Sequence, residues 1–236
     1  MNAALDLYTE LEAALLRKRL YGAYPALVTD IKDPDGQGRV KVKLPWSPDS
    51  GDGSYEVWAR LALLMAGNNR GTWFIPDPND EVLVMFEAGD PRLPYVIGAL
   101  WNGKDKPPEQ MDGAAKNFKK TIRSRNGLKI TLDDQDGSES ITLETPGGQK
   151  ITLKDGPGSI ELQDSNGNNI KTDPAGITVR AAADIKVTSS GTVTVSALSV
   201  TVNAAQSTFS GVVQANSFIT PSVIGGSYTP GAGNIW

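Results

Sequence analysis

The sequence lacks two residue types on which much protein chemistry depends. Its 236 residues include no cysteine and no histidine. The first absence excludes disulfides, thiol nucleophiles and cysteine-ligated metals, and the second excludes histidine-ligated metals and every catalytic triad built on an imidazole. Few enzyme mechanisms remain, so we expect no catalytic residue, no cofactor and no metal site.

The sequence is also short of positive charge and of long apolar runs. Its formal net charge is −4, which argues against a phosphate-binding surface and makes nucleic acid an unexpected partner. No stretch approaches the roughly 20 apolar residues of a membrane span. The N-terminus has neither the basic start nor the apolar run of a signal peptide, so we expect the chain to be made and folded in the cytoplasm.

Residues 126–220 repeat one short pattern, in which two apolar residues flank a single other residue. Such alternation places both apolar side chains on one face of a strand. We expect the following pairs to face a core: Ile130 and Leu132, Ile141 and Leu143, Ile151 and Leu153, Ile160 and Leu162, Ile177 and Val179, Ile185 and Val187, Val193 and Val195, and Val200 and Val202.

Turn residues such as Asp136-Gly137 and Pro146-Gly147-Gly148 separate these pairs. Repeats that cannot bury an apolar face alone stack on copies of themselves, as in a solenoid or β-helix. Two or three apolar residues per repeat are too few for one chain to enclose a core. We therefore predict an intertwined homotrimeric β-helix, and an up-and-down antiparallel sheet of hairpins is the alternative.

The first hundred residues have a different pattern. Residues 1–20 predict a helix, with Leu5, Tyr8 and Leu11 on one side; it would cover one end of the next domain or dock on a partner. Five alternating strands follow, over residues 26–31, 39–44, 56–64, 81–87 and 95–101. Five strands in this length fit a small closed barrel such as an OB-fold.

Three segments of this barrel carry a resemblance to a known family. In a fixed order, residues 39–45 (RVKVKLP), 78–91 (PNDEVLVMFEAGDP) and 94–103 (PYVIGALWNG) resemble the OB-fold domain of the baseplate central spike of contractile phage tails. VgrG proteins of type VI secretion and the spikes of tail-derived injection particles share this domain. The β-repeat that follows is what the family places next.

The resemblance implies a trimeric spike that punctures the target cell envelope, in a virion tail baseplate or an injection particle assembled in the host cytoplasm. We assign a helix (1–20), the OB-fold (21–103), a linker (104–125), the β-helix (126–220) and a tip (221–236). The linker is too short for the muralytic domain that some members carry. The hub domain that precedes the OB-fold in VgrG is missing, so a separate baseplate hub protein is an expected partner.

Some phage spikes of this kind close their tip around iron held by a His-x-His pair, which this sequence lacks. We therefore expect a metal-free tip, with the apolar residues Phe218, Ile219, Ile235 and Trp236. The last two would fold onto an apolar plug or bind a separate tip cap protein.

An enzyme is the alternative function, because single-chain β-helices include polysaccharide- and peptidoglycan-degrading enzymes; a carbohydrate-binding tail module is another. Asp133, Asp134, Asp136 and Glu139 lie close together in the sequence, and paired carboxylates can act as acid and base. They follow directly after a predicted strand, where aspartate favours a solvated turn. We therefore expect a structural role for them.

Overall fold

The structure is a computed structural model that describes residues 19–47 and 55–227. Apart from one 3-10 turn, Glu87–Gly89, every regular element in these ranges is a β-strand. The chain divides into two compact units, Met1–Asp184 and Ile185–Trp236. The helix predicted over residues 1–20 lies outside the described residues except for its last two.

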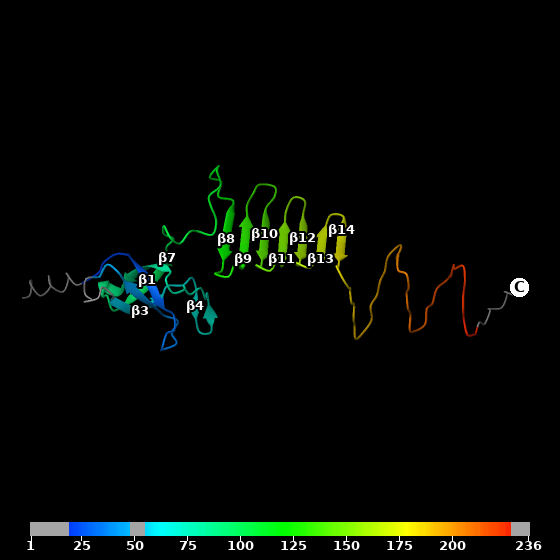
Figure 1. The fold of residues 1–236 in the computed structure, drawn as a ribbon, viewed down its shortest axis with the longest axis horizontal. Helices are drawn as coiled ribbons and strands as arrows, with labels where there is room; N and C mark the ends of the chain where they lie inside the picture. Colours follow the sequence, from blue (N-terminus) through cyan, green and yellow to red (C-terminus); the bar gives the residue numbers. More distant parts are fainter. Residues whose placement is uncertain (1–18, 48–54, 228–236) are drawn as a thin grey trace, which may run out of the picture. The chain divides into compact units, whose positions relative to one another are not determined.

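Five strands close a barrel in the order β1-β2-β3-β7-β6 (Figure 1). Neighbouring strands are antiparallel except β3 and β7, which pair in parallel through Arg60 with Tyr95 and Leu61 with Val96. The predicted five-stranded OB-like barrel is therefore confirmed. The strands are β1 (Tyr24–Asp30), β2 (Val40–Leu44), β3 (Tyr55–Leu61), β6 (Glu81–Phe86) and β7 (Pro94–Ala99).

The barrel encloses a core made only of apolar side chains, as far as the described residues show. Strand alternation buries Val40, Val42 and Leu44 of β2 and leaves Lys41 and Lys43 on the outer side. Burying each such aliphatic side chain contributes about 1.5–3 kcal/mol. The rest of the core is Ala26, Val28, Ala59, Val82, Val84, Phe86 and Val96.

A small hairpin that the sequence does not predict lies between β3 and β6. It consists of β4 (Ala66–Gly67) and β5 (Arg70–Gly71). Four large apolar side chains in the residues that flank it are exposed: Leu64, Met65, Trp73 and Phe74. Exposed apolar side chains gathered in this way are typical of a protein contact.

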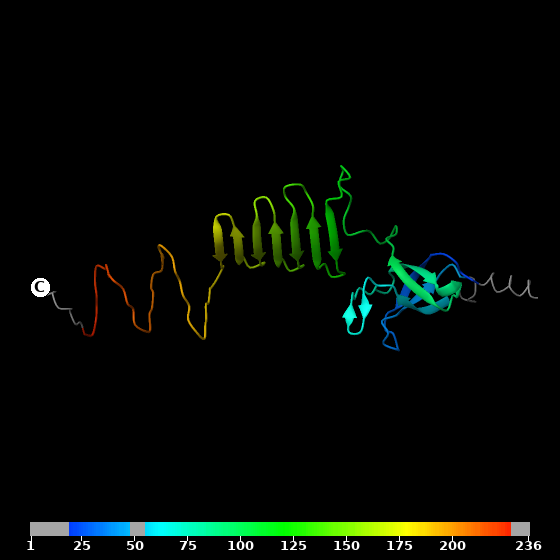
Figure 2. The same cartoon turned by 180° about the vertical axis from the view of Figure 1, so that it is seen from behind.

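The second half of the first unit is one sheet of seven strands in chain order, each antiparallel to its neighbours (Figures 1 and 2). Within one chain, residues 119–180 thus adopt the up-and-down arrangement of hairpins that the sequence left open. The first strand lies inside the segment predicted to be a linker. The strands are β8 (Lys119–Arg123), β9 (Lys129–Asp133), β10 (Ser140–Glu144), β11 (Lys150–Lys154), β12 (Ser159–Gln163), β13 (Asn169–Asp173) and β14 (Gly176–Arg180).

The loops that join the strands differ between the two ends of the strands, and we call these two rows of loops the two edges of the sheet. Along one edge, residues 124–128, 145–149 and 164–168 form loops of five residues each. Along the other edge the loops shorten from six residues (134–139) to four (155–158) and then two (174–175), as Figure 1 shows. The loops therefore become shorter along one edge only.

Residues 185–227 form no strand pair and no backbone–backbone hydrogen bond with the described part of the chain. The chain is extended and bends near residues 190, 198 and 205, and then near 210, 216, 221 and 226. Its straight runs thus shorten toward the C-terminus.

A carboxylate fixes the turn between β1 and β2. Asp33 accepts hydrogen bonds from the backbone N–H groups of Asp35 (3.1 Å), Gln37 (2.7 Å) and Arg39 (3.1 Å). The Arg39 guanidinium donates to the same carboxylate at 2.7 Å and lies over the Trp58 ring. Above all through the Arg39 side chain, these donors hold the pKa of Asp33 far below its usual value.

The variant Asp33→Asn tests this turn through its pH dependence. A lowered folded-state pKa means that the carboxylate contributes stability above its unfolded pKa near 3.8 and loses that contribution as the pH falls toward the folded pKa. We expect a lower thermal unfolding midpoint than the parent at neutral pH, and a difference that shrinks below about pH 4. Circular dichroism melts across this range measure it.

Asp35→Asn is the matched control, because among the described residues the Asp35 carboxylate accepts only from Arg39. It should lower the midpoint less. A difference between Asp33→Asn and the parent that stays constant down to the most acidic pH would contradict this role of Asp33.

Candidate functional site

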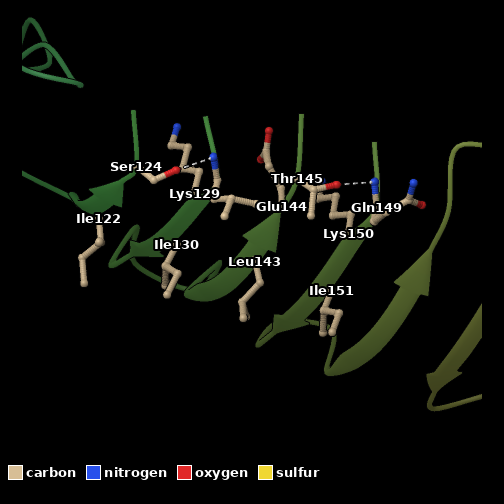
Figure 3. A pocket seen from close by; sticks show the side chains of 11 residues that line it. Ile122, Ser124, Lys129, Ile130, Leu143, Glu144, Thr145, Gln149, Lys150 and Ile151 are labelled. Atoms are coloured by element: carbon tan, nitrogen blue, oxygen red, sulfur yellow. Dashed lines mark hydrogen bonds between the residues drawn. The ribbon is translucent and has the colours of Figure 1, made fainter. Parts of the chain in front are cut away.

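Two rows of side chains cross one side of the seven-stranded sheet, and we call this side the apolar face. Strand register aligns the first row, and Figure 3 shows Ile122, Ile130, Leu143 and Ile151 from four adjacent strands pointing to the same side. Leu162, Ile170 and Val179 continue this row. The second row is Lys120, Leu132, Ile141, Leu153, Ile160, Thr172 and Ile177.

The large apolar side chains of this face are all exposed. Their exposed fractions run from 39% for Ile130 to 75% for Ile177. The strands hold them side by side, and the first part of this array lines an open apolar hollow between β8 and β11 (Figure 3). A soluble protein rarely leaves so many adjacent apolar side chains in water, so this face requires a covering surface.

The opposite side of the sheet, the polar face, carries hydrophilic side chains. Register aligns Thr121, Thr131, Thr142 and Thr152 in one row, and such cross-strand threonine pairs stabilise a sheet. The row continues with Glu161, Lys171 and Thr178.

The segment before β8 is attached to the polar face. Glu109 accepts hydrogen bonds from the Lys129 ammonium at 2.7 Å and from the Thr121 hydroxyl at 3.0 Å. Both donors belong to the polar face, and Lys129 foremost lowers the pKa of Glu109. The linker therefore contacts the polar face through Glu109, and on the other side the Lys120 ammonium donates to the Asn117 carbonyl at 2.8 Å.

The acidic cluster considered as catalytic is used in turns. Asp133 accepts from the N–H of Gln135 at 3.2 Å, Glu139 accepts from the N–H of Gly137 at 3.1 Å, and Asp134 pairs with Lys120. Throughout residues 19–47 and 55–227, no group of three or more acidic side chains is arranged to hold a metal ion. The same ranges contain no helix long and apolar enough to cross a bilayer.

Two known protein domains match the two halves of this chain. Residues 24–101 match the type VI secretion system/phage-baseplate injector OB domain, which coincides with the barrel. Residues 140–208 match the phage baseplate V C-terminal trimerisation domain, which begins at β10. The two matches follow one another along the chain, so this chain is similar to an injector OB domain followed by a trimerisation domain.

Curated relatives extend the likeness to spike proteins. The type VI secretion system spike protein VgrG1b of Pseudomonas aeruginosa is 29% identical over 127 residues, which are 51% of this chain and 17% of that protein. VgrG3 of Vibrio cholerae is 33% identical over 113 residues, 46% of this chain and 11% of that protein. The actin cross-linking toxin VgrG1 of Vibrio cholerae is 32% identical over 113 residues, 46% of this chain and 10% of that protein. The chain spans less than a fifth of the length of these relatives.

The apolar face includes every predicted core residue between Ile130 and Val179. The later predicted residues Ile185, Val187, Val193, Val195, Val200 and Val202 are exposed on chain that forms no ladder, so no face is assigned to them. At the predicted tip, Phe218 and Ile219 are exposed. Ile235 and Trp236 lie outside the described residues.

Sequence reasoning missed two strands of this face, β8 and β13. Each carries only one apolar side chain on the face, Ile122 or Ile170, because Lys120 and Thr172 occupy the other position. A pattern that demands two apolar residues passes over both. A signal was present for β13, since the interval from Leu162 to Ile177 is long enough for another strand and contains the Asn166-Gly167 turn.

The variant Glu109→Gln tests the attachment of the linker to the polar face. It removes the charge that pairs with Lys129 while keeping the size of the side chain. We expect faster amide hydrogen exchange in the segment before β8 and unchanged exchange in the barrel. Hydrogen-exchange mass spectrometry of the full chain measures both.

Glu144→Gln is the matched control, because it removes a carboxylate from the same polar face at the end of β10. It should leave the linker protected. Equal linker exchange in Glu109→Gln and the parent would show that Glu109 does not hold the segment.

Proposed function

We propose that this chain is the structural central spike of a contractile injection machine, a phage tail or a tail-derived particle, and that it is not an enzyme. One observation carries the proposal: an uncovered apolar face follows an injector OB barrel, and its strands from β10 to β14 lie in the region that matches a trimerisation domain. The names of the matched spike proteins support it. The turn roles of Asp133 and Glu139 favour this reading over a glycan-degrading enzyme or a carbohydrate-binding module.

The covering surface that the apolar face requires is two further copies of the same face. Three sheets with their apolar faces turned inward enclose a core that one sheet cannot. The predicted core residues from Ile130 to Val179 then line the common axis, and Ile122 and Ile170 join them. The linker attached through Glu109 supports this orientation, because it lies on the polar face and would remain outside the trimer.

Residues 185–227 would associate by a different pairing. Their backbone N–H and C=O groups have no backbone partner within the described chain, although buried backbone groups in proteins are almost always paired. Three such segments wound round one axis would pair with one another, as in the predicted intertwined β-helix. Val187, Val195 and Val202 would then face that axis.

The distribution of charge supports a mechanical role. After Lys186 no charged residue occurs up to Trp236, whereas the preceding strands are rich in acidic and basic residues. Moving ionised groups into a lipid layer costs free energy, and a needle whose backbone groups are paired within the trimer avoids a second cost. A leading end of this composition suits puncture of the target cell envelope.

A separate baseplate hub protein is the proposed partner of the barrel end. The exposed side chains that flank the β4–β5 hairpin, Trp73 and Phe74 among them, support a protein contact there. The residues around Phe218 and Ile219 would form a metal-free tip or bind a cap protein. Assembly would take place in the host cytoplasm, before the virion tail or injection particle is complete.

The variant Ile151→Asp tests the trimer. It places one carboxylate per chain in the proposed shared core, and an uncompensated buried charge costs several kcal/mol even after relaxation. We expect the parent to be a trimer of the 25.1 kDa chain and the variant to lose trimer or to lower its unfolding midpoint strongly. Light scattering and thermal melts measure the two effects.

The adjacent substitution Thr152→Asp is its matched control. Thr152 lies on the polar face of the same strand, so the added charge stays in water and the trimer should persist. A monomeric parent, or equal losses in the two variants, would rule out an inward-turned apolar face.

A triple substitution of Thr192, Thr194 and Ser196 by lysine tests penetration. It adds charge to the needle beyond Lys186, and we expect reduced dye release when the protein is driven mechanically against liposomes. Lysines at Thr131, Thr142 and Thr152, in the already charged sheet, provide the control. Equal leakage from the parent and both variants would indicate that the uncharged end reflects strand propensity alone.

A further inference from the structure

One position interrupts the apolar face between β9 and β14. Each of these strands presents two side chains to the face, and all are apolar except Thr172 of β13. Register places Thr172 between Ile160 and Ile177 of the adjacent strands. Its hydroxyl forms no hydrogen bond with any other described residue. A lone hydroxyl in an apolar row requires an explanation, because a buried hydroxyl without a partner is destabilising.

We propose that Thr172 forms a polar layer that sets the register of the three chains. This inference rests on the proposed trimer, in which the apolar faces meet at a common axis. Three symmetry-related Thr172 hydroxyls then lie at one level of the needle. A hydroxyl is both a donor and an acceptor, so each can donate to one neighbour and accept from the other. The three hydrogen bonds close a ring.

Between β9 and β14, the apolar face offers no other polar side chain that could set the register of the three chains. The strands alternate in direction, so a chain that slips by one hairpin superposes β13 on β11 and keeps every strand direction. Leu153 occupies the corresponding position of β11. Everywhere else between β9 and β14 the slipped face sets apolar side chains against apolar side chains, which discriminates weakly between registers.

A slipped trimer loses the ring of hydroxyls. The Thr172 hydroxyl of the displaced chain then faces leucine side chains and has no partner, whereas in register all three are satisfied. Single polar positions in the apolar seams of coiled coils fix register in this way. Thr172 is therefore a specificity-determining residue for self-assembly, and its chemical partner is the same residue of two further copies.

The variant Thr172→Val tests the proposal, because valine keeps the shape of threonine and removes the hydroxyl. A spin label attached to Ala175→Cys, in the exposed turn after β13, reports register, since the chain has no other cysteine. With threonine at position 172 we expect one label-to-label distance. With valine we expect a second, longer distance, because a slip of one hairpin moves a label by about 10 Å along the axis.

Two controls separate the possible outcomes. Thr172→Ser keeps the hydroxyl and should give one distance, and Ile160→Val, a neighbouring apolar change, should do the same. Failure of Thr172→Val to assemble while Thr172→Ser assembles would also support a required hydroxyl. A single distance in Thr172→Val, or loss of assembly in both variants, would overturn the polar layer. Light scattering on the labelled parent tests the trimer separately, so a monomeric parent refutes the proposed function itself.

Discussion

The main physical constraint on this molecule is an apolar sheet surface that the described part of one chain does not cover. Seven strands of five residues present two side chains each to one side, and the described part of the chain places nothing over them. The sheet stays open, because its first and last strands, β8 and β14, do not pair with each other. This half of the chain therefore leaves an apolar surface in need of a cover, whereas the barrel covers its own core by closure.

The barrel and the sheet have the same alternation of apolar and polar residues, but the barrel buries its apolar side chains and the sheet leaves them exposed. In β2, Val42 is 0% exposed because five strands close around it, whereas Ile151 of β11 is 40% exposed in an open sheet. Both segments read as apolar residues separated by threonine or lysine. The difference lies in connection. The barrel strands β3 and β7 meet across a long stretch of sequence and close the ring, while each strand of the sheet pairs only with its neighbours in the chain.

Much of this could be predicted from the sequence, and the failures have a common physical origin. Local alternation identifies β2 and the strand faces of Ile130 or Ile151, since the side-chain period of a strand does not depend on its partner. The alternation does not show which strand is the partner. A repeat that pairs within its own chain and one that winds around other chains have the same period, so the hairpin sheet of residues 119–180 remained only an alternative. The strands β8 and β13 were missed because each has a polar residue, Lys120 or Thr172, at a position where the repeat pattern requires an apolar one.

The shortening loops along one edge of the sheet set a limit on that series of turns. They contain six, four and two residues in turn, and two residues is the shortest common connection between antiparallel strands. A further step of the same size would leave no residues for a turn. The series of shortening loops therefore cannot continue past the turn between β13 and β14. Residues 185–227 form no strand pair within the described chain and change direction by bends alone.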